Sequence, residues 1–184
     1  MAAERLILAS RSPQRRAILE QLGVDFRVEP PEVEEVTGGD PRAVALDNAL
    51  RKARAVEGEL VLAVDTEVVL DGRAFGKPRD SDEAETFLRR LSGRTHEVMG
   101  GIALRLAHGE ERTDVAITRV RFRLLEQHDV DWYVASGEWR ERAGGYAIQG
   151  RGAALVAGIE GDYWNVVGLP VTSLVALAPE LFDS

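Results

Sequence analysis

Asp65 is the residue of this sequence that most strongly suggests chemistry, because it interrupts the otherwise mostly apolar run of residues 60–70. A carboxylate inside a buried strand must face water, pair with a cation or bind a metal ion. The loop of residues 32–40 carries Glu32, Glu34 and Glu35, whose oxygens are ligands of the type that Mg²⁺ prefers. Glutamates in loops are usually solvated, so Asp65 carries the stronger indication of a functional role.

The basic residues are divided very unevenly between two types. Of the 23 Lys and Arg residues, only Lys52 and Lys77 are lysines. One interpretation is a coding bias that replaced Lys wherever only charge mattered. The other is that these two positions need a compact ammonium on a flexible stem, which a planar guanidinium does not imitate. Gly76-Lys77 is not part of a Walker A motif, because Pro78 stands where Ser or Thr must bind magnesium.

Two further segments could bind a nucleotide. Residues 10–16, SRSPQRR, lie between an expected strand and an expected helix, where backbone amides, hydroxyls and guanidinium groups can converge on phosphate. The alternative is a capped helix with solvated arginines. Residues 143–152 are glycine-rich and either let a ligand approach the backbone or form a tightly packed turn. Gln149 in this stretch is able to read a base edge through its amide.

Composition excludes several other classes of protein. The chain has 184 residues, no cysteine and three histidines, none at metal-pair spacing, which argues against a thiol nucleophile or a zinc site. A net charge of −8 argues against nucleic-acid binding, which relies on basic patches. No apolar stretch nears the ~20 residues that span a bilayer. We therefore expect neither a signal peptide nor a membrane partner, and a cytoplasmic location.

The elements that must position these residues alternate at first between strand and helix. We expect strands at residues 5–9, 25–29 and 60–70, and helices from Pro13 to Gly23, from Pro41 to before Gly58 and over residues 80–91. A long antiparallel hairpin of residues 95–107 and 111–124 follows, then a helix at 127–136, a strand at 153–159 and a helix at 170–177. This order predicts an α/β fold with a mixed sheet, in one domain or two intimate lobes.

Taken together, these segments resemble the Maf family of nucleotide pyrophosphatases over nearly the whole chain. The matching motifs occur in order at residues 8–16, 33–35, 63–66, 76–78, 91–98, 143–152 and 161–170. The resemblance implies a single domain over residues 1–184, with an elongated, mixed and partly antiparallel twisted sheet flanked by helices around a central cleft. This is the architecture of inosine-triphosphate pyrophosphatase. It also implies hydrolysis of a nucleoside triphosphate to monophosphate and pyrophosphate.

Position by position, the resemblance implies a role for each candidate. Asp65 would accept the proton of the attacking water, and Glu35 with Asp65 would hold a divalent cation, Mg²⁺ or Mn²⁺. Lys52 and Lys77 match the family's two functional lysines and complete the catalytic set. The residues that would grip the phosphates are Ser10, Arg15 and Arg16, and those associated with substrate choice are Gln14, Thr66 and Gln149.

The substrate is the point at which this chain departs from the family pattern. Gln14 stands where dTTP/UTP members usually carry Arg, and Arg142 replaces a usual Lys. The resemblance implies dTTP, UTP or a modified pyrimidine nucleotide, cleaved in house-cleaning of the nucleotide pool, and a homodimer. The alternatives are another base preference, such as 7-methyl-GTP or CTP, and a non-catalytic nucleotide-binding regulator of cell division. The carboxylate and lysine set favours an enzyme, because binding alone needs no proton acceptor.

Overall fold

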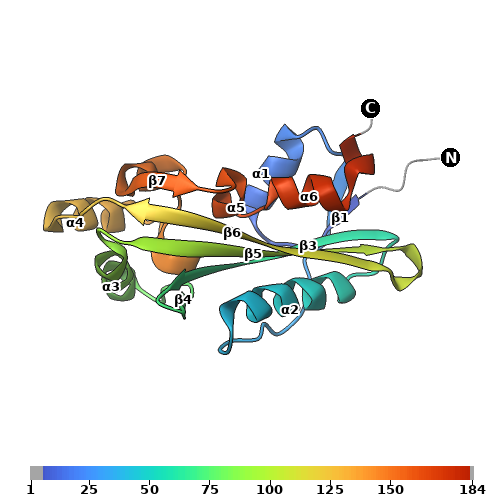
Figure 1. Ribbon diagram of the computed structural model, residues 1–184, viewed down its shortest axis with the longest axis horizontal. Helices are drawn as coiled ribbons and strands as arrows, with labels where there is room; N and C mark the ends of the chain where they lie inside the picture. The colour runs from blue at the N-terminus through green and yellow to red at the C-terminus, as the bar shows by residue number, and fades with distance from the viewer. Residues whose placement is uncertain (1–5, 183–184) are drawn as a thin grey trace.

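The computed structural model describes residues 6–182, which form one mixed and twisted sheet with helices packed against it (Figure 1). The strands are β1 (Leu6–Leu8), β2 (Phe26–Val28), β3 (Leu60–Leu70), β4 (Arg73–Phe75), β5 (Thr95–Leu106), β6 (Glu111–Phe122) and β7 (Val156–Glu160). The helices are α1 (Pro13–Gln21), α2 (Pro41–Arg54), α3 (Ser81–Leu91), α4 (Gln127–Ser136), α5 (Tyr163–Val167) and α6 (Val171–Leu177). No helix in this part of the chain has the length and apolar character needed to cross a membrane.

The sheet combines a short parallel part with a long antiparallel part. Its strand order is β2-β1-β3-β5-β6-β7, with β4 paired to β3 outside this path. β1 pairs in parallel with β2 and β3, whereas β3, β5, β6 and β7 are antiparallel neighbours. The predicted mixed α/β sheet and its long hairpin are therefore confirmed.

The middle of β3 has a free edge. β1 pairs with β3 only as far as Leu62, and β4 begins to pair at Val68. Within the described chain, residues 63–67 consequently have no strand partner on that side. Asp65 and Thr66 lie in this unpaired stretch. Their side chains point to opposite faces of β3, and a ligand at the free edge can contact both.

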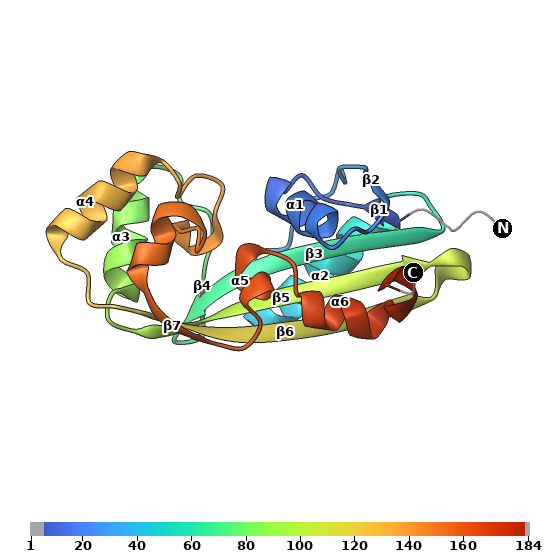
Figure 2. The ribbon, with the colours of Figure 1, turned by 90° about the horizontal axis from the view of Figure 1, so that it is seen from above.

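Two apolar clusters cover one face of the sheet, one at each end. The near cluster joins Leu62 and Val64 of β3 to α1 and α6, and the far cluster joins Val68 and Leu70 to α3 and α4. Figure 2 shows these two pairs of helices over opposite ends of the long strands. Strand side chains alternate between faces, so Thr66 lies on the covered face at the division between the clusters.

Helix α2 packs closely against the other face. Small residues, including Ala49 of the helix and Ala63 of β3, form the apolar contact between them. Gly101 of β5, which pairs with Asp65, sits beneath Ala45, and a β-carbon at Gly101 would overlap the Ala45 carbonyl group. Glycine at this position therefore allows α2 to approach the sheet closely enough to bring its polar side chains against Asp65.

Two details differ from the sequence-based expectation, and a third cannot be compared. The strand expected at residues 153–159 begins only at Val156, because a 3₁₀ turn occupies Gly150–Leu155. α5 was not anticipated, since a helix of five residues, capped by Asp162, is too short to show a periodic pattern. Arg5, expected to begin the first strand, lies outside the described residues.

Gly101→Ala should destabilise the protein and displace α2, because the new methyl group would meet helix backbone that cannot rotate away. Overpacking of this kind costs about 1–3 kcal/mol. Denaturant unfolding would measure the loss. Gly158→Ala on β7 is the matched control, because its methyl group would meet only the end of the Arg121 side chain. Equal stability of the two variants would contradict the close approach of α2.

Candidate active site

A cleft of 1360 Å³ opens at the free edge of β3. One wall contains the loop after β1, the acidic loop and the start of α2. The other wall contains the segment after β4 and the chain between α4 and β7. All predicted site residues except Arg16 line this cleft, namely Ser10, Gln14, Arg15, Glu35, Lys52, Asp65, Thr66, Lys77 and Gln149.

Lys52 and two carboxylates form the centre of the near wall. The Lys52 Nζ atom lies 2.6 Å from Asp65 Oδ1 and 2.6 Å from Glu35 Oε1. Asn48, one helical turn before Lys52, donates from Nδ2 to Asp65 Oδ2 at 3.2 Å. The Asn48 amide also accepts from the backbone N–H of Val36 at 2.7 Å and donates to its carbonyl at 3.1 Å. Asn48 thereby ties the acidic loop to the site and brings Glu35 beside Lys52.

The opposite face of β3 carries the second part of this wall. Arg15 Nη2 donates to Thr66 Oγ1 at 3.1 Å, Nη1 donates to Ser10 Oγ at 3.2 Å, and Nε donates to the Gly168 carbonyl at 2.8 Å. Burial lowers the pKa of Arg15, and the nearby carboxylates of Asp65 and Glu35 oppose that shift. The guanidinium is therefore fixed in the cleft wall, and each terminal nitrogen retains a further N–H for an anion.

The far wall brings Lys77 and the glycine-rich stretch together. Lys77 Nζ donates to Glu141 Oε2 at 3.2 Å, and both side chains are largely exposed. Gly144 has a φ of +71°, and its N–H donates to the Gly76 carbonyl at 3.1 Å. Gln149 is exposed at the cleft. The glycine-rich stretch is thus a packed turn that also forms a wall of the cleft, and the approach of a ligand to its backbone stays a prediction.

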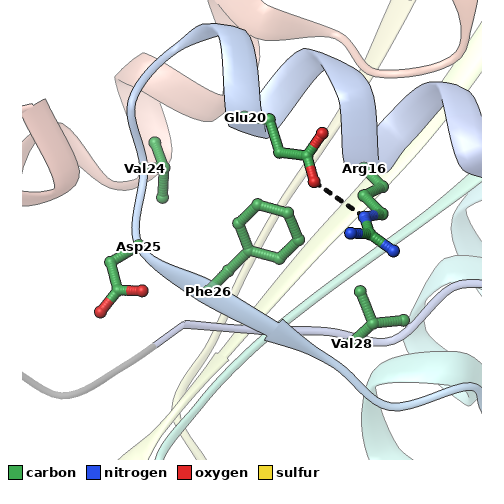
Figure 3. Close-up of a pocket in the computed structure, with 6 residues that line it drawn as sticks. All are labelled: Arg16, Glu20, Val24, Asp25, Phe26 and Val28. Atoms are coloured by element: carbon green, nitrogen blue, oxygen red, sulfur yellow. Dashed lines mark hydrogen bonds and ion pairs between the residues drawn. The ribbon is translucent and has the colours of Figure 1, made fainter.

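Arg16 does not reach the cleft. Its Nε donates to Glu20 Oε1 at 2.8 Å in a separate hollow that Val24 and Phe26 also line (Figure 3). Consecutive residues of an α-helix point about 100° apart, and the step from Arg15 to Arg16 carries Arg16 away from the cleft to the side of α1 near Phe26. The expectation that Arg16 grips the phosphates therefore needs correction, and Arg15 is the guanidinium of α1 that faces the cleft.

The near wall suits a hard divalent cation. Asp65 and Glu35 both contact Lys52 Nζ, so their carboxylates lie close together and could share a cation beside this ammonium group. Residues 6–182 contain no group of three or more His, Cys, Asp or Glu side chains that could hold a metal ion. Two carboxylates leave the other coordination positions to water and substrate phosphate, which is the usual arrangement for Mg²⁺.

Sequence reasoning missed two residues of this wall. Glu67 follows Asp65 by two positions and so lies on the same face of β3. Burial raises the pKa of Glu67 to about 7, and the charges of Asp65 and Glu35 add to the rise. Asn48 precedes Lys52 by four positions, on the same face of α2. The strand period and the helix period were the signals that would have found them.

Comparisons with known proteins identify relatives over nearly the whole chain. A family model described as Maf-like protein matches residues 5–181. A dTTP/UTP pyrophosphatase of Anaeromyxobacter sp. (strain Fw109-5) is 51% identical over 181 residues, covering 95% of this chain and 88% of that protein. A dTTP/UTP pyrophosphatase of Thermus thermophilus is 50% identical over 173 residues, covering 94% of this chain and 92% of that protein.

A solved structure shares the fold at low identity. It is the structure of a HAM1 protein from Coxiella burnetii, which aligns with a TM-score of 0.55 and 19% identity over 98% of this chain and 100% of that one. The family model and the relatives at half identity each extend over almost the whole chain. The chain therefore belongs to the Maf family.

Proposed function

We propose that this protein hydrolyses a pyrimidine nucleoside triphosphate, dTTP or UTP, to the monophosphate and pyrophosphate. The observation that carries the proposal is the Asp65 carboxylate, buried at the free edge of β3 and held by Lys52 and Asn48. The relatives of about 50% identity, which are named dTTP/UTP pyrophosphatases, support the same reaction.

Asp65 is the proton acceptor in this proposal. Cleavage between the α- and β-phosphates needs a water molecule to attack the α-phosphorus, and water is a poor nucleophile at neutral pH. A carboxylate that accepts the water proton removes this difficulty. Lys52 and Asn48 donate to different oxygens of Asp65, which fixes the carboxylate plane. The rigid position fits a base that must align with one attacking water.

Cations of the cleft stabilise the charge that spreads over the phosphates. Arg15 and Lys52 lie on the near wall and Lys77 on the far wall, so a triphosphate in the cleft meets positive charge on both sides. Ser10 supports this arrangement, since its oxygen accepts from Arg15 and its own proton remains available to a phosphate oxygen. A divalent ion held by Glu35 and Asp65 would polarise the α-phosphate and lower the pKa of a bound water.

A further part of the proposal concerns the residues that select the nucleotide base. Thr66, Gln149 and Gln14 line the same cleft and are assigned to substrate choice. Gln14 accepts a hydrogen bond from the Ser12 hydroxyl at 3.2 Å, which leaves its amide nitrogen to meet the nucleotide.

We assign the chain as one domain of two lobes that acts in the cytoplasm without nucleic-acid or membrane partners. A homodimer stays a prediction.

A panel of nucleotides tests the reaction and its base preference. We expect dTTP and UTP to give the highest kcat/KM with magnesium, releasing one pyrophosphate for each monophosphate and no orthophosphate. The panel would include CTP, GTP, ATP and 7-methyl-GTP, with products separated by chromatography. Faster turnover of 7-methyl-GTP or CTP would overturn the base assignment. Nucleotide binding with no hydrolysis of any compound would favour a regulator of cell division.

Asp65→Asn should reduce kcat by roughly 10²–10⁴-fold, because the amide keeps the shape of the side chain and cannot accept the proton. Steady-state pyrophosphate release at saturating magnesium measures the loss. Asp114→Asn is a control, since this carboxylate lies outside the cleft and hydrogen-bonds Ser173. Wild-type turnover in Asp65→Asn would show that another group accepts the proton.

Lys52→Arg and Lys77→Arg should each lower kcat/KM about 10- to 100-fold, the effect expected from losing a well-placed charged hydrogen bond. Arginine keeps the charge in both variants. At position 52, however, the planar guanidinium is too broad for the site between two carboxylates that the Lys52 ammonium group occupies. Thermal unfolding would confirm that both variants fold. Full activity in both would favour coding bias as the reason for the rarity of lysine.

A further inference from the structure

Arg142 on the far wall is a cation with no evident partner. It precedes the turn Ala143–Gly145, and its side chain lines the cleft. The Nε atom is buried without a hydrogen-bond partner, and no carboxylate of the described chain forms an ion pair with the guanidinium. Burial lowers the pKa of Arg142, which shows that its surroundings disfavour the charge.

The other cations of the cleft are accounted for. Lys52 lies between two carboxylates, Lys77 pairs with Glu141, and Arg15 makes three hydrogen bonds. Arg140 stacks on the Trp139 ring at 4.8 Å. The two that remain, Arg11 and Arg73, are exposed to water. Arg142 thus differs from the rest in being partly buried and also unpaired.

The carboxylate of Glu138 forms no ion pair with Arg142. Tyr133 and Glu138 both raise the pKa of Arg142, against the larger lowering effect of burial. The two carboxylate oxygens of Glu138, however, accept from the backbone N–H of Arg151 at 2.9 and 3.1 Å. A half-buried guanidinium that forms no ion pair costs free energy in the empty protein. A negatively charged ligand in the cleft would remove that cost.

We propose that Arg142 binds the leaving pyrophosphate part of the substrate, the β- and γ-phosphates, from the far wall of the cleft. The assignment of these two phosphates follows from position. In the proposed reaction Asp65 and Lys52 act at the α-phosphate from the near wall, whereas Arg142 and Lys77 both lie on the far wall. The hydrogen bond from Gly144 N–H to the Gly76 carbonyl, 3.1 Å long, joins the two short segments that carry Arg142 and Lys77.

Guanidinium groups suit this role, because their fork of N–H donors matches two phosphate oxygens at once. The inference rests on the proposed hydrolysis of a nucleoside triphosphate, and it adds one substrate-binding residue to that proposal. It requires Arg142 to act on the leaving group and not on the nucleoside or the α-phosphate.

Arg142→Gln tests the inference through binding of inorganic pyrophosphate, measured by titration calorimetry with magnesium chloride present. We expect pyrophosphate to bind about 10- to 100-fold more weakly than to the wild type, and dTMP affinity to change less than twofold. Arg121→Gln is the matched control, because it removes the same charge from an exposed position of β6 outside the cleft. The control should bind both compounds as the wild type does.

Thermal unfolding separates this role from a structural one. Removing an unpaired, partly buried charge should leave the unfolding temperature of Arg142→Gln equal to that of the wild type or higher. A variant that is less stable or fails to fold would show that Arg142 supports the wall, and would overturn the inference. Unchanged pyrophosphate affinity, or an equal loss for dTMP and pyrophosphate, would also overturn it.

The same measurements distinguish the inference from the proposed function. A wild type that releases pyrophosphate from dTTP, beside an Arg142→Gln variant with unchanged pyrophosphate affinity, refutes only the role of Arg142. A wild type that hydrolyses no nucleotide refutes the proposed function. The calorimetric comparison of pyrophosphate with dTMP still decides whether Arg142 belongs to a pyrophosphate site.

Discussion

The site depends on one buried ammonium group. Lys52 holds Asp65 and Glu35 at 2.6 Å each, and without it two carboxylates would face one another at the edge of a strand. A lysine can serve there because its charge is compact and its stem is narrow enough to pass along the packed face of α2. The close packing of α2 against the sheet is therefore needed to place Lys52 beside the two carboxylates. It depends in turn on small residues and on Gly101, beneath Ala45, which place the helix directly over Asp65.

The place of the cleft follows from how the sheet is assembled. β1 is short and leaves β3 after Leu62, whereas β4 joins β3 at Val68. The helices that cover this side of the sheet form two separate apolar clusters, with Thr66 at the division between them. The stretch of β3 that has no strand partner is also the stretch that lies between the two apolar clusters. A ligand at this edge can therefore contact Asp65 on one face of β3 and Thr66 on the other. A continuous strand partner would have closed this access.

The sequence was sufficient to predict those parts that depend on local patterns. The run of residues 60–70 was predicted with the same bounds as β3, and the starts of α1 and α2 were predicted at Pro13 and Pro41, where the structure has them. The parts that failed depend on packing between distant segments. Whether Arg15 or Arg16 faces the cleft is decided by how α1 sits on the sheet, and the role of Asn48 depends on its contacts with Val36 and Asp65. All but one of the site residues named by the motif resemblance line the cleft, but the resemblance could not show their partners.

The two walls of the cleft differ in how their charges are balanced, and this difference bears on the reaction. On the near wall Arg15 and Lys52 already have partners, so the groups nearest Asp65 are held in fixed positions before substrate arrives. Fixed groups suit the attack on phosphorus, where a small displacement of the base or the water is costly. On the far wall Lys77 has only an exposed partner, and Arg142 has none within the described chain. Cations with weak or absent partners contribute most to the free energy of binding a polyanion, because few existing interactions are lost when it binds. A triphosphate therefore meets a rigid near wall that positions the reacting phosphate and a far wall whose positive charge is largely uncompensated until the substrate is bound.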